Sequence, residues 1–161
     1  MKKTLLFFLL LMAILLQGKG IFADAKAGSA VAALEYNKEK QVIEKLFQQR
    51  AALWNRVYND ANSIQSFKKD LQMIEEDPLL SMDLEAFEEA RNYPTDLDLV
   101  LDMEVQGIED VSYGRTKMKA IVKINWKMQG QSSYYYEEIH YKVILIKSDR
   151  VWKLYDFATI Q

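Results

Sequence analysis

The sequence of 161 residues contains no Cys, a single His, two Pro and six Gly. Without Cys, disulfides, a thiol nucleophile and a Cys-based zinc site are all excluded. One His cannot supply the several nitrogen or sulfur ligands that zinc prefers, and the few glycines form no phosphate-binding loop. We therefore expect neither a metal nor a cofactor.

An excess of positive charge is also missing. The chain has 21 Lys and Arg against 23 Asp and Glu, which gives a net charge of -2. Nucleic-acid-binding domains usually carry a basic patch, so nucleic acid is not expected as a partner. Apolar residues make up 50% of the chain, which is enough for one domain with a core.

The N-terminus has the pattern of a secretory signal peptide. Lys2 and Lys3 precede an apolar run from Leu5 to Leu16, and Ala23-Asp24-Ala25 offers small residues to a signal peptidase. The alternative is an uncleaved membrane anchor, but the run is shorter than the ~20 residues that cross a bilayer. We expect residues 1–25 to be removed after Ala25, residues 26–34 to form a short leader, and the mature chain to be secreted or extracytoplasmic.

Three helices are expected in the first half of the remaining domain, residues 35–161. The first begins near Glu35, where apolar residues recur at three- and four-residue steps on one stripe. That stripe consists of Val42, Ile43, Leu46, Phe47, Leu53, Trp54, Val57 and Tyr58. A second helix is predicted from a Ser63 cap to Asp77-Pro78, and a third over residues 81–91.

After Pro94 the period of the apolar residues changes to two. Residues 96–105 and 117–128 alternate between apolar and polar side chains, as half-buried strands do. Pairing them antiparallel places Glu104 opposite Lys117 and Asp102 opposite Lys119, and each such pair contributes roughly 0.2 to 1 kcal/mol. A different register of the same parity stays open, because the connecting loop is long enough to hide a bulge.

Two further hairpins extend the predicted sheet. The first has Gly130-Gln131 at its tip, and its pairs are Trp126 with Tyr135, Ile124 with Glu137 and, on the other face, Lys123 with Glu138. The second has Ser148-Asp149 at its tip, and its pairs are Leu145 with Trp152, Val143 with Leu154 and Tyr141 with Asp156.

This order of elements predicts an α+β fold, with three N-terminal helices packed on a curved four-stranded antiparallel meander. The chain resembles the nuclear-transport-factor-two-like superfamily, which includes steroid isomerases and scytalone dehydratase. The resemblance covers about residues 35–160 and rests on the element order and on the closing segment DRVWKLYDF, residues 149–157. It implies a sheet bent round a conical pocket. A cystatin-like module with one helix is the alternative, and the extra helices count against it.

Catalytic members of that superfamily keep a carboxylate or a His-Asp pair inside the cone, with a Tyr as hydrogen-bond donor. The pairing above directs five candidate ligand-binding side chains inward, namely Trp126, Tyr135, Glu137, Tyr141 and Asp156. Glu137 or Asp156 is the candidate base and Tyr141 the candidate donor. We favour a structural role for these carboxylates, because perturbed carboxylates are common in structural networks. The only His, His140, is expected on the outer face.

The outer face of the last two strands is predicted to be apolar, through Ile144, Ile146, Val151, Tyr155 and Phe157. A second copy of the chain is the simplest partner for such a patch, so a homodimer through this face is expected. The leading functional hypothesis is an exported, non-catalytic module that binds a small apolar ligand or an envelope protein. The alternatives are a small isomerase or dehydratase and an accessory subunit of a surface or secretion assembly.

Overall fold

The computed structural model describes residues 36–56, 64–92, 98–130 and 132–160. The predicted signal peptide and leader lie outside these residues, as do Val57, Tyr58, the Ser63 cap and Pro94. The chain divides into two units, residues 1–39 and 40–161. Residues 36–39 of the first unit are helical, and everything below concerns the second.

Three helices precede the sheet in the second unit. The first, here called the long helix, covers residues 40–55, and α2 (Ile64–Leu71) and α3 (Leu79–Asn92) follow it. The Asp77 carboxylate accepts hydrogen bonds from the Ser81 backbone N–H at 3.2 Å and from the Ser81 hydroxyl at 2.6 Å. Asp77 therefore caps the first turn of α3, with Pro78 at a position where its missing N–H costs nothing.

The second helix is shorter than the predicted span of residues 63–77. It ends at Leu71, and the segment after it pairs with the sheet instead. The Leu154 N–H donates to the Ile74 carbonyl at 2.8 Å, and the Glu76 N–H donates to the Leu154 carbonyl at 2.9 Å. The apolar spacing of Ile74 predicted a helix, but hydrogen bonds to Leu154 pair this segment with the edge of the sheet instead.

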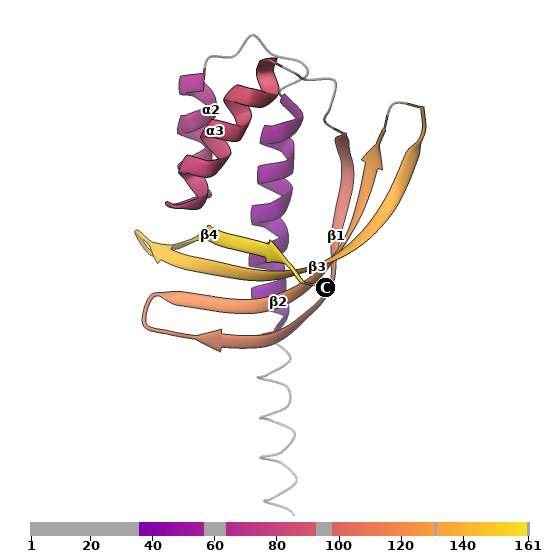
Figure 1. The fold of residues 1–161 in the computed structure, drawn as a ribbon. Helices are drawn as coiled ribbons and strands as arrows, with labels where there is room; N and C mark the ends of the chain where they lie inside the picture. Colours follow the sequence, from indigo (N-terminus) through magenta and orange to yellow (C-terminus); the bar gives the residue numbers. More distant parts are fainter. Residues whose placement is uncertain (1–35, 57–63, 93–97, 131, 161) are drawn as a thin grey trace, which may run out of the picture. The chain divides into compact units, whose positions relative to one another are not determined.

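The four strands form one antiparallel meander in the order β1-β2-β3-β4. Their bounds are Leu99–Tyr113, Lys117–Gln129, Tyr134–Ser148 and Val151–Thr159. The strands are strongly bent, and the helices lie against one face of the sheet (Figure 1). The predicted α+β class is confirmed.

The predicted register between β1 and β2 is wrong. Glu104 lies opposite Asn125 and Asp102 opposite Lys127, so neither acid faces Lys117 or Lys119. β1 continues to Tyr113 through three irregularities, one of which contains Asp110 with a φ of 49°. The connection is consequently a tight turn, closed by the Gly114 N–H donating to the Lys117 carbonyl at 2.7 Å.

The pairing of β2 with β3 is displaced by two residues from the prediction, which leaves every side chain on its expected face. Trp126 lies opposite Glu137, and Ile124 opposite Ile139. The connection lies one residue later in the chain than predicted, because the Gly130 N–H donates to the Ser133 carbonyl at 3.0 Å. The Lys123 ammonium still meets the Glu138 carboxylate at 2.8 Å, now as a diagonal neighbour.

The pairing of β3 with β4 departs from the prediction in two ways. The turn is Asp149-Arg150, with φ values of 49° and 68°, so Ser148 pairs with Val151. An irregularity after Leu154 then moves each later residue of β4 to the opposite face of the sheet. Asp156 pairs with Ile144, and Phe157 pairs with Val143.

The faces predicted for Asp156 and Phe157 are therefore both wrong. Asp156 is exposed on the outer face, and Phe157 points inward. The Phe157 ring lies 5.2 Å from that of Phe47 and 5.7 Å from that of Tyr141, measured between centroids. Burial of this aromatic side chain favours the bulge that turns it toward the helices.

The other residues of the predicted outer patch lie where the alternation places them. Ile144, Ile146 and Tyr155 are half-buried and Val151 is exposed, and lysines stand among them on β2 and β3. The Lys117 ammonium lies 4.2 Å from the centroid of the Tyr155 ring. A homodimer through this face stays a prediction.

Candidate functional site

A cavity of about 170 Å³ lies between the long helix and the β1 and β2 strands. Two aromatic side chains, Trp54 and Trp126, contribute to its wall. Its full lining is Arg50, Ala51, Trp54, Asn55, Asp98, Val100 and Trp126. Because the long helix and β2 belong to the core, rigid elements position most of these side chains.

The Arg50 guanidinium is held by Asp83 of α3 in a bidentate ion pair. Nε donates to Oδ2 at 2.8 Å and Nη2 donates to Oδ1 at 2.7 Å. The Trp54 indole N–H donates to the same carboxylate, at 3.1 Å from Oδ2. The guanidinium also lies 5.6 Å from the centroid of the Trp54 ring and 4.9 Å from that of Phe157. Arg50 is thus fixed by charge, geometry and aromatic contact together.

A second carboxyl group, Glu75, lies against this pair and is fully buried. Its Oε1 is 3.2 Å from Arg50 Nε, but that N–H points to Asp83, and neither Glu75 oxygen accepts a well-aligned hydrogen bond. Burial, followed by the nearby Asp83 charge, raises the pKa of Glu75 from 4.5 to about 8, although Arg50 opposes the shift. Glu75 is therefore protonated at neutral pH, while Arg50 and Asp83 neutralise each other.

Trp126 presents a buried hydrogen-bond donor that makes no well-aligned hydrogen bond in the described residues. Its indole Nε1 has no partner with hydrogen-bond geometry in the described part of the chain. The ring of Tyr141 lies 6.4 Å from that of Trp126 between centroids. Burial raises the pKa of Tyr141, whereas the Trp126 N–H facing its hydroxyl lowers it. A buried donor left unpaired costs roughly 1 to 3 kcal/mol.

The rim of the cavity carries one carboxylate that is exposed to solvent. Asp98 accepts a hydrogen bond from the Tyr135 hydroxyl at 2.6 Å. This bond, with the Asp98 charge, raises the pKa of Tyr135. Tyr135 and Asp98 together connect the start of β3 to the residue before β1 at the cavity rim.

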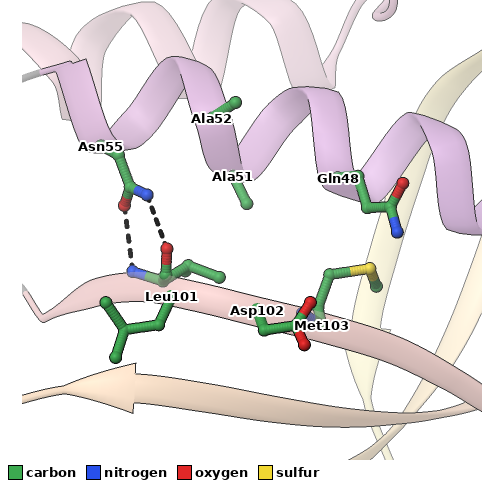
Figure 2. Close-up of a pocket in the computed structure, with 8 residues that line it drawn as sticks. Gln48, Ala51, Ala52, Asn55, Leu101, Asp102 and Met103 are labelled. Carbon is green, nitrogen blue, oxygen red and sulfur yellow. Dashed lines mark hydrogen bonds between the residues drawn. The ribbon is translucent and has the colours of Figure 1, made fainter. Parts of the chain in front are cut away.

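A second hollow of about 260 Å³, here called the edge groove, runs between the long helix and β1. It is lined by Gln48, Ala51, Ala52, Asn55 and residues 100–103. Figure 2 shows Gln48 and Ala51 pointing from the helix toward β1, and two hydrogen bonds between the Asn55 side chain and the strand backbone. Ala51, Asn55 and Val100 belong to both hollows, so the cavity and the groove are neighbours.

The structure brings together three of the five predicted ligand-binding residues. Trp126 lines the cavity, Tyr141 packs behind it, and Tyr135 stands at the rim. Glu137 lies on the same face, opposite Trp126, but it is exposed. Asp156 is on the outer face, away from all of these.

The central charged residues, Arg50, Asp83 and Glu75, were missed in the sequence. A signal was present, because Arg50 interrupts the apolar stripe four residues after Leu46 and four before Trp54. Asp83 likewise stands four residues before the buried Phe87. A charged residue in the middle of an apolar stripe is expected to have a buried partner.

Neither a metal cluster nor a membrane-spanning helix is found in the described ranges. No group of three His, Asp or Glu side chains there could hold a metal ion. Within the same ranges, no helix is both long enough and apolar enough to cross a bilayer.

Comparisons with known proteins identify no family. No protein-family model matches the sequence, and the search of curated proteins gives no match. Among solved structures, the chain is similar to the intermembrane space region of the chloroplast protein ARC6, with 11% sequence identity and a TM-score of 0.49. The similarity covers 75% of this chain and 95% of that one.

We predict that replacing Glu75 with Gln removes a pH dependence of stability. Above pH 4.5 the unfolded chain releases the Glu75 proton, whereas the folded chain keeps it to about pH 8. The free energy of unfolding therefore falls as pH rises through this window, by up to about 1.4 kcal/mol per pH unit. Urea denaturation across the window should show this fall for the unmodified chain and a smaller fall for Glu75→Gln.

Glu76→Gln is the matched control. The hydrogen bond to Lys153 lowers the pKa of Glu76. The ionised Glu76 side chain therefore contributes its full stabilisation above pH 4.5, and this stabilisation is lost only at lower pH. This variant should keep the fall. Equal slopes for the unmodified chain and Glu75→Gln would contradict a proton held by Glu75 in the folded state.

Proposed function

We propose that this chain is an exported, non-catalytic binding module, and that its cavity takes a small ligand with an apolar ring and an acceptor oxygen. The observation that carries this proposal is the Trp126 side chain, which lines the cavity and whose buried N–H makes no well-aligned hydrogen bond among the described residues. A ligand oxygen that accepted this hydrogen bond would recover the free energy that the unpaired donor costs.

The chemistry of the cavity favours an acceptor over a donor in the ligand. Trp126 offers its N–H, and Asp83 engages Nε and Nη2 of Arg50 but not Nη1. The Asn55 amide is occupied by the backbone of Val100. A carboxylate or a carbonyl is therefore the group that the cavity suits best.

The size and walls of the cavity favour a single ring. Its volume of about 170 Å³ is close to the ~150 Å³ of an apolar protein cavity that takes up benzene. The rings of Trp54 and Trp126 offer flat apolar surface on which an aromatic ligand can pack.

Binding is favoured over catalysis because the candidate bases are badly placed for it. Glu137 and Asp156 are exposed, and Glu75, whose pKa is near 8, is fully buried and does not line the cavity. Asp98 does line the cavity, but it is exposed and bonded to Tyr135. A general base must reach the proton that it removes.

We further infer a distant membership of the nuclear-transport-factor-two-like superfamily. Three helices, a bent four-stranded meander and a cavity between them support this assignment. The steroid isomerases of that superfamily are then relatives in fold and not in activity.

Export is supported by the N-terminal charge, apolar run and small residues. Sequencing the N-terminus of the protein collected outside the cytoplasm should give a chain that begins at Lys26. A chain that still begins at Met1 in the membrane fraction would identify an uncleaved anchor.

For the ligand, we predict that aromatic carboxylates such as benzoate and indole-3-acetate bind the purified protein and that benzylamine does not. Two cavity tryptophans allow the measurement, because a ligand between them quenches their fluorescence. Trp126→Phe keeps a ring but removes the donor, and should weaken carboxylate binding about tenfold.

Trp152→Phe provides the matched control, since Trp152 is in β4 and does not line the cavity. This variant should bind the carboxylates as the unmodified chain does. Equal binding of benzoate and benzylamine, or unchanged binding by Trp126→Phe, would overturn the proposed ligand class.

A further inference from the structure

At the exposed edge of the sheet, a side chain of the long helix makes the hydrogen bonds that a neighbouring strand would make. β1 is an edge strand, and an edge strand offers backbone N–H and C=O groups that no strand occupies. The Val100 N–H donates to Asn55 Oδ1 at 3.0 Å, and Asn55 Nδ2 donates to the Val100 carbonyl at 2.7 Å. A residue of an adjacent antiparallel strand would make this same pair of bonds.

A side chain also occupies the next part of this edge. The Met103 N–H donates to Asp102 Oδ1 at 2.9 Å. Asn55 and Asp102 can leave these bonds by a change of side-chain rotamer, without any movement of a strand. Side chains thus satisfy both backbone groups of Val100 and the N–H of Met103, and an incoming strand can replace them.

The edge groove leaves room beside these bonds. Ala51 is the small residue of the long helix that faces β1, and the hollow between helix and strand has a volume of about 260 Å³ (Figure 2). Leu101, on the strand side of the groove, is 50% exposed. An extended chain with small side chains toward the helix would fill this space.

The charge of β1 indicates which chain would fit. Residues 98–113 contain no Lys or Arg. They contain five exposed acidic residues, Asp98, Asp102, Glu104, Glu109 and Asp110. The lysines that pair with β1 belong to β2, on the opposite side of β1 from its free edge. Two copies of this chain would repel each other if their β1 edges paired, whereas a basic segment would be attracted.

We propose that the edge of β1 binds an extended, basic peptide segment of a partner protein by strand addition, with the peptide backbone taking the place of the Asn55 carboxamide at Val100. Alternate residues of the segment face the long helix and are small or apolar. The residues between them face solvent and the acidic side chains of β1, and are Lys or Arg.

The test uses three nine-residue peptides and the purified protein. The first peptide alternates Val with Lys, the second replaces each Lys with Glu, and the third keeps the Val and Lys side chains but carries N-methyl groups on the backbone nitrogens of alternate residues. Fluorescence anisotropy of the labelled peptides gives the affinities. Amide chemical shifts of residues 100–105, from nuclear magnetic resonance, give the place of binding.

We expect the Lys peptide to bind and to shift the amides of residues 100–105. The Glu peptide should show no binding, and the N-methylated peptide should bind at least about tenfold more weakly because its ladder hydrogen bonds are lost. Asn55→Ala should bind the Lys peptide about three- to tenfold more tightly, because no side chain competes for Val100.

Two neighbouring residues of one type give a matched pair of variants. Gln48 lines the edge groove and Gln49 does not, and both are exposed. Gln48→Trp should block the peptide, while Gln49→Trp should leave its affinity unchanged, with the thermal midpoints of both variants confirming that they fold. Trp126→Phe should leave peptide binding unchanged, which separates this site from the small-ligand cavity.

Equal affinity for the normal and the N-methylated peptide would overturn the proposal, because strand addition requires those backbone bonds. Failure of the Lys peptide to bind would overturn it as well. Shifts of the same amides that depend on protein concentration without peptide would identify a second copy as the occupant and would replace the proposal.

Discussion

The ion pair between Arg50 and Asp83 is the interaction on which the arrangement of the helices depends. It joins the long helix to α3, and Glu75 beside it belongs to the segment that pairs with β4. The side chain of Arg50 is 21% exposed and that of Asp83 is 7% exposed. Charges with so little contact with water are tolerated only when they are paired with good geometry, so this bidentate contact strongly favours one orientation of the long helix.

The position of both hollows follows from that orientation. With Arg50 directed at α3, Trp54 packs against Phe67 and Phe87 at centroid distances of 6.0 and 5.8 Å. Asn55, one residue later, then reaches the edge of β1. The cavity and the edge groove lie on the two sides of this Asn55 contact and share it, so a peptide that displaced Asn55 would also alter a wall of the cavity.

The sequence predicted the elements and most of their faces, because apolar periodicity reports directly which side of a strand or helix is buried. It failed where an inserted residue breaks the alternation. The predicted loop between residues 105 and 117 belongs largely to the bulged strand β1, which continues to Tyr113. The irregularity at Tyr155 reversed the faces of Asp156 and Phe157. Such bulges depend on tertiary contacts, such as that of Phe157 with Phe47, which local patterns do not contain.

The candidate site was predictable only in its aromatic part. Trp126, Tyr135 and Tyr141 follow from strand alternation, whereas Arg50 and Asp83 are 33 residues apart on two helices. Their pairing depends on how the helices pack, and spacing along the chain does not reveal it. The apolar stripes could show that each charged residue lies on the buried face of its helix. They could not show which residue is its partner.

The most direct test of this account is a double-mutant cycle of Arg50→Met and Asp83→Ala, followed by urea denaturation at pH 7. Each single variant removes the bidentate partner of a largely buried charge and should lose about 3 to 5 kcal/mol of stability. The double variant should then lose less than the sum of the two, by at least about 2 kcal/mol. Losses that add to within about 0.5 kcal/mol would contradict the claim that this ion pair holds the helices in place.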